Sequence, residues 1–199
     1  TAAGLSAGAL AGSAAVGLPF FCAAFAYWAL MLGYTFHLKR VVILDIFTIA
    51  AGFVLRAVGG AVAIPVPISA WLLVCTMLVA LFLALGKRRA ELTTSQQPEL
   101  QRESLSDYSV PFIDQMVSVV TAATVVSYTL YAFQSGTASR SHGLLLTVPF
   151  VLYGIFRYLY LIYQKDLGES PDQLLVEDRP LLVTLILWAA VCVALIWSR

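Results

Sequence analysis

The chain has 199 residues, of which 60% are hydrophobic and 12% are charged, and its formal net charge is +1. Soluble domains carry about a quarter of their residues as charged side chains, so this composition and a mean hydropathy of +0.87 exclude an ordinary soluble domain. We predict an all-α integral membrane protein, a multi-helix transmembrane bundle, with no nucleic-acid partner. The cysteines lie in apolar runs without the spacing of a disulfide framework or a zinc site.

The predicted spanning helices follow from the apolar runs, because a helix needs about 20 mainly apolar residues to cross a bilayer. Six runs qualify, at residues 18–36, 41–64, 68–86, 111–133, 143–163 and 180–197. The preceding stretch 4–17 is rich in small residues and too short to cross alone, so it is expected to be a partial seventh helix. Residues 1–199 are expected to form a single transmembrane domain.

The loops between these spans alternate in charge, and cytoplasmic loops of membrane proteins carry an excess of Lys and Arg. The loops predicted to be cytoplasmic are the one with Lys39 and Arg40, residues 87–110 and residues 164–179. The loops predicted to be external are residues 65–67 and 134–142. Apart from Asp45, every acidic residue lies in or at the edge of the predicted cytoplasmic loops, which indicates an active face at one membrane surface.

Asp45 and Arg56 are charged residues inside a predicted span. Charges at such depth cost several kcal/mol unless they are paired or hydrated, which makes both residues functional candidates. They are eleven residues apart, so they share a helix face and are separated by roughly 16 Å along the axis. We expect either an ion pair with another helix or a role in lining a polar cavity, and Asp45 is the better candidate for chemistry. The same face carries Thr48, Gly52, Gly59 and Gly60.

Arg157 lies among Tyr153, Tyr160 and Tyr163 near the end of another predicted span. Aromatic residues gather at membrane interfaces, and an Arg side chain can extend to the interface from inside the bilayer. Interfacial anchoring is therefore the first interpretation. The alternative is binding of a lipid headgroup or phosphate, for which a planar guanidinium is suited.

The motif "GKRRAEL" at residues 86–92 places three consecutive cations at the end of a predicted span. Topology alone explains cations at this place. Glu91 adds a carboxylate, which topology does not require but a magnesium–diphosphate site does, because Mg²⁺ bridges carboxylate oxygens to substrate phosphates. Further polar residues are predicted on the same side of the membrane, namely Lys39, Arg40, Tyr108, Asp114 and Gln115.

These segments together resemble the decaprenyl-phosphate phosphoribosyltransferases, a branch of the UbiA-type prenyltransferase superfamily. The resemblance covers about residues 34–188 and is carried by "YTFHLKRVVILDIFTIAAGFVLRAVGGAVAIPVPIS", "LFLALGKRRAEL", "YSVPFIDQM", "VPFVLYGIFRYLYLIY" and "SPDQLLVEDRPLLVTLILW". It implies an all-helical bundle of nine spans, of which six to seven are present here, with a central cavity capped by cytoplasmic loops. It also implies two Mg²⁺-dependent diphosphate motifs on the cytoplasmic side.

The first of these implied motifs, an Asp-rich helix, is absent, although "AAGLS" at residues 2–6 resembles the sequence that follows it in the superfamily. We therefore expect that this chain lacks the N-terminal helices with the main metal-binding carboxylates. The second motif is replaced by "GKRRAEL", with a single acid. This departure favours the phosphoribosyl branch over transfer of a prenyl group to an aromatic ring.

The resemblance implies transfer of 5-phosphoribose from 5-phosphoribosyl 1-diphosphate to a polyprenyl phosphate, with release of diphosphate, for cell-wall arabinan precursors. It implies Mg²⁺ as cofactor and a multi-pass protein of the bacterial plasma membrane with a cytoplasmic active site. The expected catalytic residues are Lys87, Glu91 and Asp45, and Glu91 is also the expected metal ligand. The expected substrate-binding residues are Lys39, Arg40, Arg56, Arg88, Arg89, Tyr108, Asp114, Gln115 and Arg157.

Two alternatives stay open. A UbiA-type aromatic prenyltransferase would need an Asp-x-x-x-Asp pattern where "KRRAE" stands. A membrane transporter or scaffold without enzymatic activity would place its polar groups near the bilayer midplane, where Arg56 and the Gly59–Gly60 pair are candidates. A homo-oligomer is compatible with each of these functions.

Overall fold

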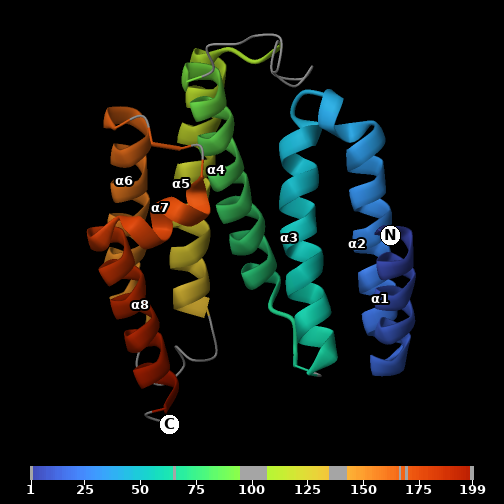
Figure 1. The fold of residues 1–199 in the computed structure, drawn as a ribbon. Helices are drawn as coiled ribbons and strands as arrows, with labels where there is room; N and C mark the ends of the chain where they lie inside the picture. Colours follow the sequence, from blue (N-terminus) through green and yellow to red (C-terminus); the bar gives the residue numbers. More distant parts are fainter. Residues whose placement is uncertain are drawn as a thin grey trace. The chain divides into compact units, whose positions relative to one another are not determined.

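The computed structural model describes residues 2–64, 66–94, 107–134, 143–165, 167–168 and 170–197. All regular structure within these residues is helical, which confirms the all-α prediction. The chain forms two compact units, and the boundary between them falls between Leu81 and Phe82, inside one long helix (Figure 1). Residues 95–106 and 135–142, which include half of the predicted loop 87–110 and most of the predicted loop 134–142, lie outside the described part.

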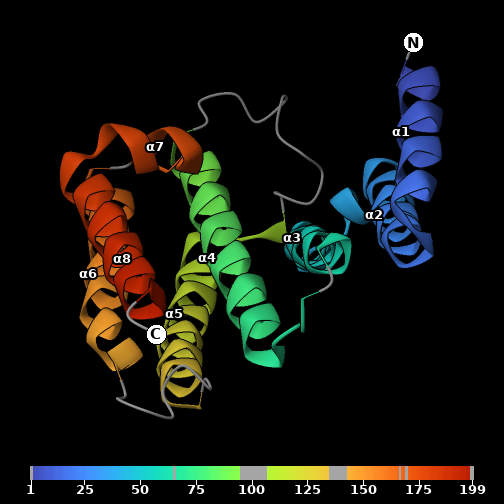
Figure 2. The same cartoon turned by 90° about the horizontal axis from the view of Figure 1, so that it is seen from below.

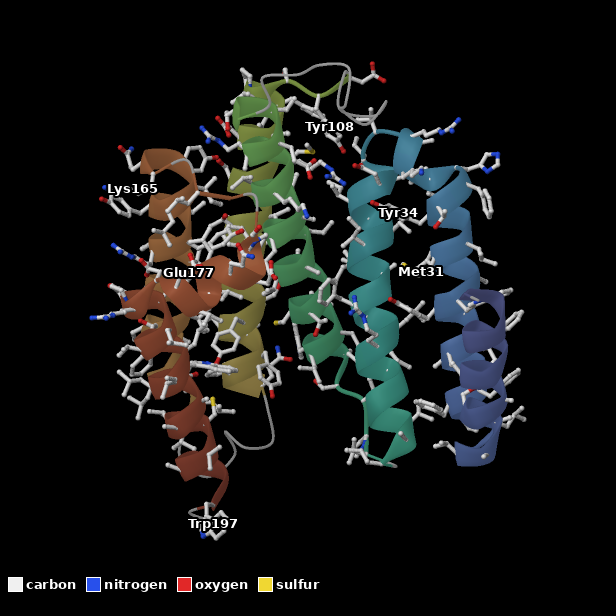
Figure 3. All side chains as sticks on the ribbon, viewed as in Figure 1. Met31, Tyr34, Tyr108, Lys165, Glu177 and Trp197 are labelled. Carbon is white, nitrogen blue, oxygen red and sulfur yellow. The ribbon has the colours of Figure 1, made fainter. Side chains whose placement is uncertain are left out.

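The N-terminal unit contains α1 (Ala2–Val16), α2 (Leu18–Phe36), the 3-10 helix η1 (Leu38–Arg40), α3 (Leu44–Ala63) and the first part of α4 (Ala70–Thr94). The helices α2 and α3 run side by side (Figures 1 and 2). A Cβ atom on Gly52 would lie only 3.1 Å from Met31 Cε, and Figure 3 shows Met31 between the two helices. The small-residue face predicted on α3 is thus used for close helix packing.

The C-terminal unit contains the rest of α4, α5 (Val110–Gln134), the 3-10 helix η4 (Gly143–Thr147), α6 (Val148–Gln164), α7 (Pro171–Glu177) and α8 (Arg179–Trp197). The end of α4, the start of α5 and the end of α6 lie at the same end of this unit (Figure 1), and Lys165 follows α6 there (Figure 3). The short helix α7 meets α8 at an angle of 85°.

Five helices within the described residues are long and apolar enough to cross a membrane, or six if the bent pair of α7 and α8 counts as one span. They correspond to the six predicted runs, so the prediction of a multi-pass membrane protein is confirmed. Residues 4–16 of the stretch 4–17 lie within α1, and Gly17 directly precedes α2.

The predicted start of a loop at residue 87 is wrong, because α4 continues as a helix through the basic motif to Thr94. The physical reason is the sequence itself: Lys, Arg, Ala, Glu and Leu all have high helix propensity, and Arg88 and Glu91 form an (i, i+3) ion pair that stabilises the added turns. The helix α7 was likewise missed within the predicted loop 164–179. It begins with Pro171, which is favoured in the first turn of a helix.

A buried chain of hydrogen bonds joins three elements of the C-terminal unit. Trp188 Nε1 on α8 donates to the Tyr128 hydroxyl on α5, at 2.8 Å. The Thr147 hydroxyl donates to the carbonyl of Leu144, at 2.5 Å. Since that bond uses the only hydroxyl proton of Thr147, the contact of 2.7 Å between Tyr128 and Thr147 has Tyr128 as the donor. Such polar contacts between helices stabilise membrane proteins where water is absent.

We predict that Tyr128→Phe destabilises the protein by roughly 1–2 kcal/mol, since it removes two hydrogen bonds and leaves the indole N–H of Trp188 without its acceptor. Thermal unfolding in detergent should show a lower midpoint than the wild type. Tyr153→Phe is the control, because Tyr153 is 49% exposed. Equal midpoints for the two variants would contradict the prediction.

Candidate functional site

The three cations of the basic motif lie in three different environments. Successive residues of a helix are rotated by about 100°, so the cations cannot all face one way. Lys87 is exposed, Arg88 is only 1% exposed, and the side chain of Arg89 is 12% exposed. Lys87, Arg88 and Arg89 therefore do not point together at a single phosphate group.

Arg88 is the largest of the fully buried side chains and is held by Glu91. Its Nη1 atom lies 2.5 Å from Glu91 Oε2, and the Glu91 side chain is 23% exposed. A buried guanidinium needs such a partner, because desolvating an unpaired charge costs several kcal/mol. Lys87 and Glu91 are spaced (i, i+4), so they share a helix face. Lys87 forms no ion pair with another residue of the described part.

Arg89 joins α4 to α5 and α6. Its Nε atom donates to Asp114 Oδ1 at 2.9 Å, and its Nη1 atom donates to the carbonyl of Ile162 at 3.3 Å. The guanidinium carbon lies 4.1 Å from the centre of the Tyr163 ring, a cation–π contact. The Tyr163 hydroxyl donates to the same oxygen of Asp114, at 2.9 Å. We refer to Arg89, Asp114 and Tyr163 as the triad.

Close backbone packing holds α4 in place beneath the triad. A Cβ atom on Gly86 would lie 2.8 Å from Ile162 Cδ1 and 3.1 Å from the Tyr158 hydroxyl. A Cβ atom on Gly168 would lie 3.1 Å from the Gly86 carbonyl oxygen and 2.9 Å from Ala90 Cβ. Side chains larger than hydrogen would force these segments apart, so the glycine that opens the basic motif has a packing role.

The remaining predicted residues of the N-terminal unit are dispersed. Asp45 is completely buried near the start of α3. It follows Ile43, whose φ of +71° is strained for a β-branched residue. Arg56 is exposed, and its guanidinium lies 4.2 Å from the centre of the Phe53 ring. Asp45 and Arg56 thus occupy different environments despite the expected common face. Lys39 and Arg40 lie in η1, with Lys39 partly buried and Arg40 exposed.

Two other predicted residues flank the start of α5. Tyr108 is 6% exposed, and its ring stacks on that of Phe112 with centroids 6.2 Å apart. Gln115 is exposed, although it directly follows Asp114 of the triad. The structure thus brings together Arg88 with Glu91, and Arg89 with Asp114.

Arg157 has a partner that sequence reasoning missed. Its Nε and Nη2 atoms donate to the two carboxylate oxygens of Asp178, at 3.1 and 2.8 Å. Asp178 Oδ1 also accepts the backbone N–H of Leu181, at 2.9 Å, and so caps the start of α8. The pair therefore fixes the bend between α7 and α8. Asp178 directly before "RP" at a helix start was the available signal.

The described residues do not by themselves make a magnesium site. No group of three or more His, Cys, Asp or Glu side chains comes together among them. Glu91, the expected metal ligand, has one oxygen bound to Arg88, whereas Mg²⁺ takes several oxygen ligands in a near-octahedral arrangement.

No protein-family model matches the chain. The Decaprenyl-phosphate phosphoribosyltransferase of Corynebacterium glutamicum is 32% identical over 176 residues, which cover 86% of this chain and 52% of that protein. The proteins of the same name from Mycolicibacterium smegmatis and Mycobacterium tuberculosis are 33% and 30% identical, over 81% and 82% of this chain and 54% of each relative. The chain spans about half the length of these relatives. At about 30% identity over more than 80% of its length, the chain is a distant homologue of these decaprenyl-phosphate phosphoribosyltransferases.

Proposed function

We propose that this protein is a membrane phosphoribosyltransferase that moves 5-phosphoribose from 5-phosphoribosyl 1-diphosphate to a polyprenyl phosphate. The observation that carries the proposal is the end of α4, where a buried Arg88 is held by Glu91 and an exposed Lys87 stands on the same face as Glu91. The homology to decaprenyl-phosphate phosphoribosyltransferases supplies the substrate classes. We place the site on the cytoplasmic face of a bacterial plasma membrane.

The reaction breaks the bond between the anomeric carbon and the diphosphate oxygen, and the electron pair leaves with diphosphate. A new bond forms between the anomeric carbon and an oxygen of the lipid phosphate. The acceptor is already an anion, so the attack needs no general base. Negative charge builds on the leaving oxygens, and fixed cations aimed at that position lower the barrier.

Lys87 and Arg88 meet this requirement in different ways. The guanidinium of Arg88 is held in place by Glu91 and is withdrawn from solvent, so its charge is preorganised. Lys87 is exposed on the same helix end and can reach a phosphate oxygen as a compact point charge. Lys87 is thus the cation that can contact a diphosphate group, and Arg88 is a fixed, buried charge behind it.

The first test measures transfer of radiolabelled phosphoribose to decaprenyl phosphate in membranes from cells that express the full-length gene. A labelled lipid that is absent from control membranes supports the proposal. If those membranes instead prenylate an aromatic acid from a prenyl diphosphate, the substrate assignment is wrong. If the protein in liposomes instead moves labelled donor into the vesicle interior and forms no labelled lipid, it is a transporter.

We predict that Lys87→Ala lowers the rate of phosphoribose transfer by about ten- to a hundredfold, because one cation is lost from the diphosphate. Steady-state kinetics in the same membranes measures this loss. The matched control is Lys165→Ala, which removes another exposed lysine of the C-terminal unit, at the end of α6. Wild-type transfer by the Lys87→Ala variant would show that the basic motif serves topology alone.

Magnesium dependence is a separate prediction that rests on the resemblance. Chelation with EDTA is expected to abolish phosphoribose transfer, and added Mg²⁺ is expected to restore it, because diphosphate groups are commonly handled together with this ion. The measurement is the labelled lipid formed before and after chelation. Undiminished transfer in EDTA would show that the protein's own cations are sufficient.

A further inference from the structure

We propose that Arg89, Asp114 and Tyr163 form a positioning triad, which fixes the orientation of the basic end of α4 without touching substrate, and that Tyr163 is its central residue. This inference rests on the proposed function, because it assigns the orientation of Lys87 and Arg88 to three residues from different helices. It also separates Arg89 from its two neighbours in the basic motif.

The contacts of Arg89 are those of a residue that holds helices together. It binds the Asp114 carboxylate on α5 and the Ile162 carbonyl on α6, and its planar face lies on the Tyr163 ring. Its side chain is only 12% exposed. These three contacts fix the position of the guanidinium from two neighbouring helices, and the paired carboxylate offsets its charge locally.

Tyr163 is central because it contacts both other members of the triad. Its hydroxyl donates to Asp114 Oδ1 at 2.9 Å, the same oxygen that accepts from Arg89 Nε at 2.9 Å. Its ring meanwhile covers the guanidinium at 4.1 Å. One side chain of α6 therefore fixes both the carboxylate of α5 and the cation of α4, and it ties the ends of the three helices together.

The directions of the side chains on α4 explain why holding Arg89 in place affects the position of the cations relative to a substrate diphosphate. At about 100° per residue, Arg89 lies roughly 160° around the helix from both Lys87 and Glu91, each of which is two residues away. The contacts of the triad thus lie on the side of α4 that faces α6, and Lys87 and Glu91 project from the other side. A rotation of α4 at this end would move both cations relative to a bound diphosphate, and small misplacements of preorganised groups reduce the rate strongly.

The primary test is Tyr163→Phe in the full-length protein, which keeps the ring over Arg89 and removes only the hydroxyl. We expect the kcat of phosphoribose transfer to fall by about tenfold, with a change of less than about threefold in the KM for 5-phosphoribosyl 1-diphosphate, because the cations remain but are less well aligned. Tyr153→Phe on the same helix is the control, since Tyr153 is exposed. Unchanged kinetics for Tyr163→Phe would overturn the proposal.

A charge exchange separates positioning from direct binding. We expect Arg89→Asp to be almost inactive. The double variant with Arg89→Asp and Asp114→Arg should transfer phosphoribose at least about tenfold faster than Arg89→Asp alone, since the ion pair is rebuilt in reverse. A cation that itself binds phosphate could not be replaced in this way. If the double variant is as inactive as Arg89→Asp, or if Asp114→Asn raises the KM for the donor with kcat unchanged, Arg89 contacts the substrate and the proposal is wrong.

Hydrogen exchange provides a readout that does not depend on enzymatic activity. We expect Tyr163→Phe to raise amide exchange at residues 86–94 of α4, while Tyr153→Phe leaves it unchanged. If wild-type membranes transfer no phosphoribose, the proposed function fails, and the exchange result alone then decides on the triad. Unchanged amide exchange at residues 86–94 in Tyr163→Phe would overturn the proposed triad. Because this variant loses only a hydroxyl, it tests the triad even if the charge-exchanged double variant does not fold.

Discussion

The free-energy cost of removing charged side chains from water determines how the helices of the C-terminal unit are joined. Its described helices bury or partly bury three guanidinium groups, and each is bound to a carboxylate: Arg88 to Glu91, Arg89 to Asp114 and Arg157 to Asp178. Two of these pairs join different helices, so the groups that would otherwise penalise folding also determine how the helices meet. The arrangement leaves Lys87 as the exposed cation of the basic motif.

The polar contacts depend on close packing of the helix backbones. Gly86 brings α4 against Ile162 and Tyr158, and Gly168 brings the following segment against Gly86 and Ala90. Without these approaches, the guanidinium of Arg89 could not reach a carbonyl of α6 at 3.3 Å. Small residues play the same part in the N-terminal unit, where Gly52 and Gly59 face α2. Packing and charge pairing are thus coupled, as expected where lipid offers no alternative hydrogen-bond partners.

The sequence predicted the spans well because about 20 apolar residues are a strong and local signal. It failed at the basic motif, where hydropathy ends a span but helix propensity continues the helix to Thr94. The ion pairs between helices could not be predicted, because Arg89 and Asp114 are separated by 25 residues and Arg157 and Asp178 by 21. Tyr163 was seen only as one of several interfacial tyrosines, since its contacts come from two other helices.

The bend at Asp178 separates the short helix α7 from α8, whose length is close to that of a membrane span. The 19 residues of α8 measure about 28 Å, close to the hydrocarbon thickness of about 30 Å, and Trp197 at its far end is 86% exposed, as suits an interfacial indole. Asp178 stands at the other end of α8, where it accepts the N–H of Leu181 and binds Arg157 of α6. Tyr163 lies six residues after Arg157 in α6, a rise of about 9 Å along the helix axis. The Asp178 pair and the triad therefore hold α6 at two levels about 9 Å apart, the first against the bend and the second against α4 and α5.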